Sequence, residues 1–368
     1  MKEGNMKQGW EIIPFEDSIV KVKYTTKVPS NDYLDKGLYP IVSQEEGLVC
    51  GYWNNANDLF KVSTPVVIFG DHTRILKYID FDFVLGADGV KILQPIENIN
   101  AKFLKYYLQY CKIPSLGYSR HYKLLKELQV PVPPLSVQEQ IVSELDLLSG
   151  ITEKKREQLK ELDALAQSIF YDMFGDPITN EKGWEVKKLG EVADIVGGST
   201  PKTNIKEYWN GDNYWVTPAE LHGTRYISST ERCITDLAVD KAHLTQLPIG
   251  TVLLSSRAPI GKVCITRVPM YCNQGFKNII CSNKLNSEYV YQYLIDKTEF
   301  LKSLGTGATF KEISKTTTEN ITIPIPPLPL QRQFATKIEA IEKQKELIKQ
   351  SISETETLFN ARMQEHFG

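Results

Sequence analysis

Paired cysteines, long apolar runs and nucleotide-binding loops are all missing from this 368-residue sequence. Its six cysteines include no Cys-x-x-Cys pair, so reduced thiols are expected instead of a zinc site or disulfides. No apolar run approaches the roughly 20 residues that cross a bilayer, and the sequence is therefore typical of a cytoplasmic protein. The five histidines lack metal-ligand spacing, and there is no Gly-x-x-x-x-Gly-Lys-Ser/Thr loop. These absences argue against a metalloprotein, a membrane protein and a P-loop nucleotide hydrolase.

A strong charge of one sign is missing too, because the net charge is only −2. The charge is unevenly distributed, however. Residues 136–175 carry 4 basic and 8 acidic side chains, whereas residues 251–318 carry 9 basic and 4 acidic ones. A positive surplus confined to one stretch is compatible with a local DNA-facing patch on a chain that is not basic overall.

A long internal repeat is the strongest feature that is present. Residues 130–140 read Val-Pro-Val-Pro-Pro-Leu-Ser-Val-Gln-Glu-Gln, and residues 323–333 read Ile-Pro-Ile-Pro-Pro-Leu-Pro-Leu-Gln-Arg-Gln. The offset of 193 needs no gap from there to the C-terminus. A second repeat, at an offset of 174, pairs Gly9-Trp10-Glu11 with Gly183-Trp184-Glu185. The sequence therefore predicts a duplicated chain in which a globular domain and a helix alternate.

Each Pro-Pro-Leu is followed by a segment that predicts one long helix. Residues 137–173 contain no proline, and apolar residues recur there every three or four positions, with a polar break at Lys155. Stripes of this period pack helix against helix, and the order of the segments requires the second helix to run antiparallel to the first. The predicted organisation is domain 1 at 1–135, spacer helix 1 at 136–175, domain 2 at 176–328 with a short linker at 176–182, and spacer helix 2 at 329–368.

The globular segments alternate short β-like runs with turn residues, and each half holds one helix-like piece. The strands are expected at 65–70, 90–93, 250–255 and 277–280, and the helices at 102–108 and 288–294. We therefore expect an α+β fold with two similar, mainly-β domains at opposite ends of an antiparallel two-helix coiled coil. A helix of about 38 residues would be roughly 57 Å long, about the length of 15 base pairs.

Polar and basic clusters recur at matching places in the two halves. Arg and Lys can bind guanine edges or phosphates, Asn and Gln can pair with adenine, and any one such residue can equally be part of a solvated loop. The candidate DNA contacts are His72, Arg74, Lys91, Ser119, Arg120, His121 and Lys123 in the first half, and Ser256, Arg257, Lys262, Asn273, Gln274, Lys277, Thr306, Thr309 and Lys311 in the second. We expect Arg257, Lys262 and Lys277 to hold the DNA backbone. Asn273, Gln274 and Arg120 are expected to reach base edges.

The spacer helices carry apolar residues beyond their regular stripe. These residues either belong to the core of the helix pair or offer extra surface on which a partner subunit docks. The candidates for docking are Phe170, Tyr171, Phe174, Leu358, Phe359 and Phe367.

This order of motifs resembles the specificity subunits of type I restriction-modification enzymes over essentially the whole chain. The matching residues are the Pro-x-Pro-Pro-Leu-x-x-Gln-x-Gln starts, the Gly-Trp-Glu openings, Gly198-Ser199-Thr200-Pro201, and the Leu-Leu-Ser-Ser-Arg run that begins at Leu253. The first domain departs from this pattern, because Phe69-Gly70-Asp71-His72 replaces the Ser-Ser-Arg run.

The resemblance implies two target-recognition domains, each reading one half of a split target on double-stranded DNA. It also implies assembly with adenine-N6 methyltransferase subunits, two in number, and with a restriction/translocase subunit. Those partners would supply S-adenosylmethionine, ATP and magnesium, so this chain is expected to bind no cofactor and to catalyse nothing itself. The alternative from a different class is a coiled-coil protein scaffold without specific DNA binding. An enzyme of unknown type lacks any convergent acid-base residues in the sequence.

Overall fold

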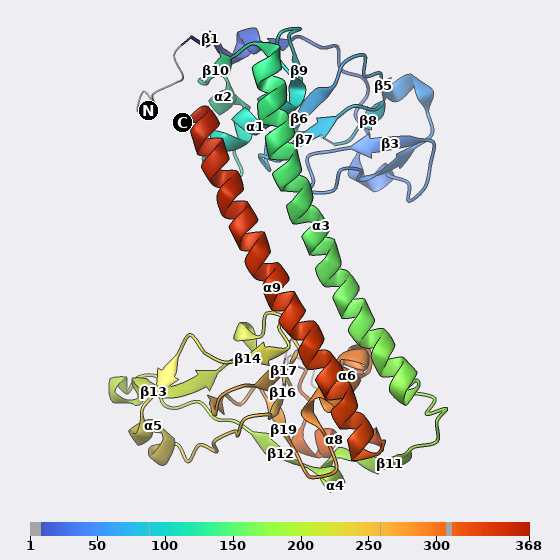
Figure 1. Cartoon of the computed structure of the whole chain (residues 1–368), viewed down its shortest axis with the longest axis vertical. Coiled ribbons are helices and arrows are strands. Elements are labelled where there is room, and N and C mark those ends of the chain that lie inside the picture. The colour runs from blue at the N-terminus through green and yellow to red at the C-terminus, as the bar shows by residue number, and fades with distance from the viewer. Residues whose placement is uncertain (1–8, 88, 258, 307–310) are drawn as a thin grey trace. The chain divides into compact units, whose positions relative to one another are not determined.

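The structure is a computed structural model that describes residues 9–87, 89–257, 259–306 and 311–368 (Figure 1). The chain divides into two compact units. Unit 1 comprises Met1–Arg156 and Lys349–Gly368, and unit 2 comprises Glu157–Ile348. Each long helix therefore contributes one part to each unit. None of the described helices is long and apolar enough to cross a membrane.

Unit 1 is built on two four-stranded sheets. The first has the order β2 (Ile19–Val20), β9 (Val90–Pro95), β6 (Val66–Gly70), β7 (Leu76–Ile79), and the second β4 (Gly51–Trp53), β3 (Tyr39–Val42), β8 (Phe83–Leu85), β5 (Leu59–Phe60). Its helices are α1 (Ala101–Tyr110), α2 (Tyr122–Leu125) and the short 3-10 turns Phe15–Ser18, Ser30–Asp32 and Ala56–Asp58. Strand β6 is apolar and buried, as a central strand should be, and its Phe69 lies in one core with Phe103 of α1.

Unit 2 has a five-stranded and a three-stranded sheet. Their orders are β12 (Ala193–Gly197), β19 (Lys277–Cys281), β16 (Val252–Leu254), β17 (Val263–Thr266), β14 (Tyr226–Ile227), and β15 (Cys233–Ile234), β13 (Trp209–Val216), β18 (Tyr271–Cys272). The helices are α4 (Leu189–Val192), α5 (Asp236–Lys241), α6 (Ser287–Asp296), α7 (Thr298–Ser303), α8 (Lys315–Glu319) and the 3-10 turns Lys206–Tyr208 and Pro218–Glu220. The order β12-β19-β16-β17 repeats β2-β9-β6-β7, and the parallel pair β13·β18 repeats β3·β8. The predicted α+β class and the duplication are therefore confirmed.

The two repeated motifs meet in each unit as a two-stranded ribbon. Strand β1 (Glu11–Pro14), which follows Gly9-Trp10, pairs antiparallel with β10 (Gln129–Val132), which carries the prolines. In unit 2, β11 (Glu185–Lys188) pairs in the same way with β20 (Thr322–Ile325). A two-stranded ribbon has a free edge on each strand, so it tolerates prolines that a central strand would not. The ribbon brings the first strand of each domain to the point where the long helix begins.

The long helices are α3 (Leu135–Phe174) and α9 (Leu328–Phe367), each of 40 residues. The first glutamine of the repeated motif, Gln138, is fully buried. Its side-chain oxygen accepts a hydrogen bond from the Asn100 amide at 2.8 Å, and its amino group donates to the carbonyls of Asn98 and Pro133, each at 2.8 Å. Asn100 is the N-cap of α1, so Gln138 fastens the long helix to the domain helix.

Unit 2 repeats this joint with Gln331, which is also fully buried. It accepts from the Asn286 amide at 2.8 Å and donates to the carbonyls of Lys284 at 3.0 Å and Pro326 at 2.8 Å. Asn286 caps α6, the counterpart of α1. The motif therefore has a structural meaning: its first glutamine satisfies three buried backbone groups.

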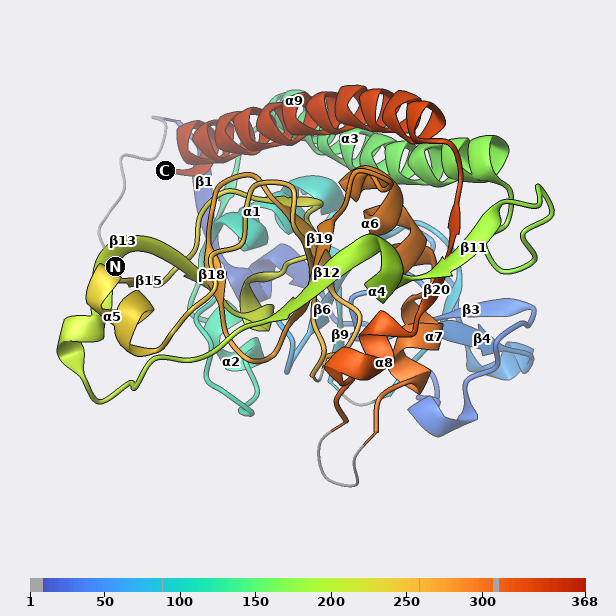
Figure 2. The same cartoon turned by 90° about the horizontal axis from the view of Figure 1, so that it is seen from below.

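Helices α3 and α9 pack against each other in opposite directions within each unit (Figure 1 and Figure 2). In unit 1, Lys155 Nζ donates to Ser351 Oγ at 2.6 Å, and Glu144 Oε1 lies 2.8 Å from Arg362 Nε. The position on α9 rises as the position on α3 falls, which is the antiparallel pairing that the segment order predicted. Lys155, which breaks the apolar stripe, is thus satisfied by polar groups of the facing helix.

Candidate nucleic-acid interface

Three candidate DNA contacts of unit 2 lie close together beside strands β16 and β19: Ser256, Arg257 and Lys277. Lys277, at the start of β19, has its ammonium group 3.2 Å from the Ser256 hydroxyl. The same ammonium donates to Glu312 Oε1 at 3.1 Å, and Arg257 Nε donates to Glu312 Oε2 at 2.9 Å. We call Arg257, Lys277 and Glu312 the charged triad. The sequence reasoning predicted its two cations and missed its carboxylate.

Backbone hydrogen bonds hold the triad in place. The Ser256 amide donates to the Gly275 carbonyl at 2.8 Å, which fixes the end of β16 against the turn before β19. The Glu312 backbone pairs with that of Thr306 through two hydrogen bonds of 2.9 and 3.1 Å. The Ile313 amide then donates to the Ser256 carbonyl at 2.9 Å. Thr306 therefore lies beside the triad, whereas the predicted contact Thr309 lies outside the described residues.

The triad has a defined ionisation state. Partial burial of Glu312 opposes its ionisation, but hydrogen bonds from Lys277 and Arg257 outweigh this and lower the pKa of its carboxyl below the ordinary value. The carboxylate is thus charged at neutral pH. Formally, the triad carries one net positive charge.

The remaining candidates of unit 2 differ in their exposure and in their contacts. Gln274 and Lys311 are exposed, and the Gln274 side-chain oxygen accepts a hydrogen bond from the Thr200 hydroxyl. Asn273 is half-buried and its side-chain oxygen accepts from the Gly275 amide at 2.9 Å, so one of its acceptor positions already serves the turn. The half-buried Lys262 donates to the Pro218 carbonyl at 3.2 Å. Thr200 was not among the candidate contacts. Its place in the Gly-Ser-Thr-Pro stretch is the sequence feature that could have indicated it.

Unit 1 arranges its candidates differently. His72, Arg74, Ser119, Arg120 and Lys123 are exposed, as a DNA-facing surface requires.

His121 does not fit the prediction of a DNA contact, because it is fully buried. Its Nδ1 lies 2.8 Å from the Asp71 carbonyl, and its Nε2 accepts from the Leu116 amide at 2.8 Å, so both ring nitrogens are used inside the fold. The carboxylate of Asp71, itself buried, lies 3.9 Å from Lys91. His121 is thus a structural residue.

Three of the predicted docking residues are buried by their own domain, which corrects the expectation of free apolar surface there. Phe170 is fully buried, with its ring centroid 5.5 Å from that of Tyr289. Phe174 lies 4.8 Å from the same Tyr289 ring, and Phe367 lies 5.4 Å from Phe103 in unit 1. The aromatic ends of the long helices therefore complete the two domain cores.

The other three predicted docking residues are less buried. Phe359 is partly buried against Tyr106, whereas Tyr171 and Leu358 are 38% and 47% exposed. Leu165, at the position equivalent to Leu358 under the offset of 193, is 46% exposed. Each unit thus carries an exposed leucine at the same point of the repeat.

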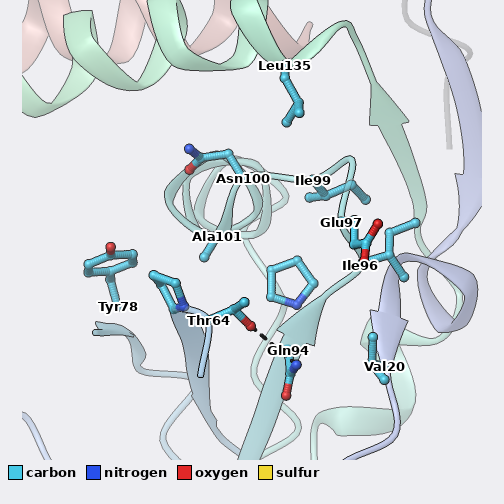
Figure 3. Close-up of a pocket in the computed structure, with 12 residues that line it drawn as sticks. Val20, Thr64, Tyr78, Gln94, Ile96, Glu97, Ile99, Asn100, Ala101 and Leu135 are labelled. Carbon is cyan, nitrogen blue, oxygen red and sulfur yellow. Dashed lines mark hydrogen bonds between the residues drawn. The ribbon is translucent and has the colours of Figure 1, made fainter. Parts of the chain in front are cut away.

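A cavity of about 420 Å³ in unit 1 lies among β9, α1 and the start of α3 (Figure 3). Its lining mixes apolar side chains such as Ile96 with polar ones such as Thr64, Gln94 and Asn100. Among the described lining residues, Glu97 is the only carboxylic acid, and no histidine, cysteine or lysine lies near it in the wall. Within the described residues there is also no cluster of three or more His, Cys, Asp or Glu able to hold a metal. These walls do not combine the acid and base groups that catalysis needs.

Comparison with known families decides the class of this protein. Residues 7–162 and 181–357 match the family described as type I restriction modification DNA specificity domain. The chain belongs to this family. Two matched segments, one beginning in each half, agree with the duplication described above. The predicted class is thereby confirmed: a specificity subunit of a type I restriction-modification system, which is the non-catalytic subunit and binds no cofactor itself.

Curated relatives carry the same description. The chain is 46% identical over 159 residues to the type I restriction enzyme MjaIX specificity subunit of Methanocaldococcus jannaschii, a match that covers 42% of this chain and 37% of that subunit. It is 27% identical over 350 residues to the EcoR124I/EcoR124II specificity subunit of Escherichia coli, covering 88% of this chain and 84% of that one.

Solved structures share the fold. The S subunit of a type I restriction-modification system from M. genitalium superposes with a TM-score of 0.65 at 14% identity, covering 100% of this chain and 98% of that chain. A chain from a structural study of complex assembly and conformational transition in a type I system gives a TM-score of 0.55 at 17% identity, covering 99% of both chains. At these identities the likeness shows the fold alone.

Proposed function

We propose that this chain reads a split target on double-stranded DNA, with one recognition domain in each unit, and docks adenine-N6 methyltransferase and restriction/translocase subunits. The observation that carries the proposal is the duplication itself. Two domains that share the order of four core strands are fastened in the same way to an antiparallel helix pair, and the sequences of their polar loops differ. Such a chain can hold two different readers in one complex. We place its action in the cytoplasm, with S-adenosylmethionine, ATP and magnesium bound by the partners.

The chemistry of the exposed loops suits DNA. In unit 2, the exposed side chains of Arg257, Gln274 and Lys311 provide a fork-shaped cation, an amide and an ammonium group. These groups match guanine acceptors, adenine edges and phosphates respectively. In unit 1 the exposed Arg120 and Lys123 likewise provide a guanidinium and an ammonium group. Methylation of an adenine also requires the base to leave the stack, and a partner fixed beside a bound reader is positioned to capture it.

The repeat supports two methyltransferase copies. Leu165 and Leu358 occupy equivalent positions of the two helices, and both are close to half exposed. An exposed leucine that recurs under the offset of 193 offers the same apolar contact twice. We therefore propose one methyltransferase at each of these leucines.

Methylome sequencing tests the function directly. Cells that express the partner methyltransferase should show adenine methylation at one two-part motif only when this chain is present. If no motif appears with the chain, or the same motif appears without it, the reading function is wrong. Duplex binding by the purified complex should also weaken steeply with added salt, because phosphate contacts release counterions. A coiled-coil scaffold would show neither result.

A further inference from the structure

We propose that Glu312 determines the specificity of the recognition domain in unit 2 by accepting a hydrogen bond from the amino group of a cytosine. Arg257 then reads the guanine of the same base pair. This inference rests on the proposed DNA-reading function and goes beyond it by naming the residue and the base. The chemistry needed is an acceptor and a forked donor side by side, which the charged triad provides.

The carboxylate of Glu312 has capacity left for a ligand. Among the described residues, each of its oxygens accepts one hydrogen bond, from Arg257 at 2.9 Å and from Lys277 at 3.1 Å. A carboxylate oxygen can accept two, so a lone pair remains on each. The Glu312 side chain is 34% exposed and that of Arg257 is 48% exposed, whereas Lys277 is only 12% exposed. The glutamate and the arginine are therefore the members that a base can reach.

Electrostatics make the triad a poor site for phosphate. Arg257 and Lys277 alone would form an anion site of two positive charges, but Glu312 neutralises one of them and already occupies a donor of each. A phosphate that approached them would also meet a like charge at hydrogen-bond distance. The triad thus loses affinity for the DNA backbone, which every sequence shares. For Arg257 we therefore propose base reading in place of the backbone contact expected from the sequence. A carboxylate at this position lowers the affinity for DNA of any sequence, and it favours only binding that selects a particular base.

A base pair of cytosine and guanine satisfies the triad as phosphate cannot. In the major groove, cytosine presents its N4 amino group as a donor, and guanine presents O6 and N7 as acceptors. Glu312 can accept from the cytosine amino group. The guanidinium of Arg257 has five N–H donors and uses its Nε–H for Glu312, so its terminal amino groups can donate to guanine. One pair therefore engages both exposed members of the triad.

Backbone hydrogen bonds hold the segment that carries Glu312. Its two backbone hydrogen bonds to Thr306, and that of the next residue Ile313 to Ser256, would remain after substitution. Glu312→Gln is therefore expected to keep the fold while it replaces a pure acceptor by an amide. Glu299→Gln is the matched control, because Glu299 is 85% exposed in α7 and its ion pair among the described residues is local, with Lys302 at 2.6 Å. Both substitutions remove one negative charge from unit 2.

The test uses the complete complex with its methyltransferase subunits. Binding is measured to duplexes changed one base pair at a time, over a series of salt concentrations, and the methylome is sequenced in parallel. Glu312→Gln should reduce discrimination on the order of tenfold at a single position of one half-site and leave the other half-site unchanged. Its affinity for unrelated duplexes should rise, with a salt slope steeper by about one, because a cation becomes free for phosphate. Glu299→Gln should change neither.

The outcomes separate this inference from the function on which it rests. The proposal is overturned if Glu312→Gln leaves the discrimination between base pairs unchanged at every position, or lowers it equally at all positions. Glu312 would then have only a structural role in its loop. The proposal also fails if Glu299→Gln relaxes the motif to the same extent. If the unsubstituted complex shows no sequence preference, the proposed function itself is wrong.

Discussion

Replacing Gln331 with Ala should weaken unit 2 selectively. The side chain is fully buried and makes three hydrogen bonds, all to backbone groups at the junction of α6, β20 and α9. Alanine leaves one N–H, of Asn286, and the carbonyls of Lys284 and Pro326 without this partner. The substitution therefore tests whether the motif glutamine is the joint between domain and helix.

The expected magnitude follows from the burial. A buried polar group left without a partner costs about 1–3 kcal/mol, and carbonyls with a second lone pair or access to water stand at the lower end. Three such groups at partly relaxed geometry give a loss of about 2–4 kcal/mol in the free energy of unfolding. A surface substitution normally changes this quantity by less than about 0.5 kcal/mol.

The same motif provides the control. Gln333, two residues along, is exposed on α9, so Gln333→Ala should have almost no effect. Urea unfolding measures the free energy, and hydrogen exchange should show faster exchange of the Asn286 amide in Gln331→Ala alone. Gln138→Ala should do the same to the Asn100 amide in unit 1. The reasoning is refuted if Gln331→Ala is no more destabilising than Gln333→Ala.

Two further predictions concern docking and pH. Leu165→Asp and Leu358→Asp should each remove one methyltransferase copy from the complex, as native mass spectrometry can count, whereas Leu347→Asp, at a 60% exposed leucine whose repeat equivalent is a lysine, should remove none. Loss of a copy in all three variants, or in none, would contradict docking at the repeated leucine. Burial raises the pKa of Asp296 to about 6, against hydrogen bonds from Gln292 and Gln167 that favour the charged form. The folded state therefore loses stability as the pH rises from about 4 through 6, because the buried carboxyl must ionise. Asp296→Asn should raise the melting temperature at pH 7.5 and leave it unchanged near pH 3.5. An equal shift at both pH values would show that the charge is irrelevant.

The regular parts of this fold could be predicted from sequence because their signals are local or repeated. The offset of 193 and the prolines before Leu135 and Leu328 predicted two long helices, and the structure begins both helices at those residues. The antiparallel pairing followed from segment order alone. Short apolar runs bounded by turn residues likewise predicted the central strands β6 and β16.

The candidate site was less predictable because its contacts are distant in sequence. Glu312 meets Arg257 across 55 residues through a bridge between two loops, so its sequence neighbours gave no sign of it. His121 resembled a loop residue, but it is buried because Asp71, 50 residues away, supplies a partner for its ring. From the sequence, Phe170 belonged either to the core of the helix pair or to a docking surface, because helix periodicity cannot tell which side a domain covers. In the structure Tyr289 covers it.

The two units are alike where the long helix joins its domain and unlike in the loops that we propose read DNA. Gln138 and Gln331 make the same three hydrogen bonds, and Tyr107 and Tyr293 each donate to the carbonyl of the first residue of the proline-containing strand. In contrast, the residue after Lys311 is Glu312, whereas the residue after Lys123 is Leu124, so unit 1 has no acid at the position equivalent to Glu312. Two identical readers could recognise only a target with two identical halves. A duplicated frame with different loops instead recognises two different half-sites while presenting the same surface twice to identical partners, which is the division that the proposed function requires.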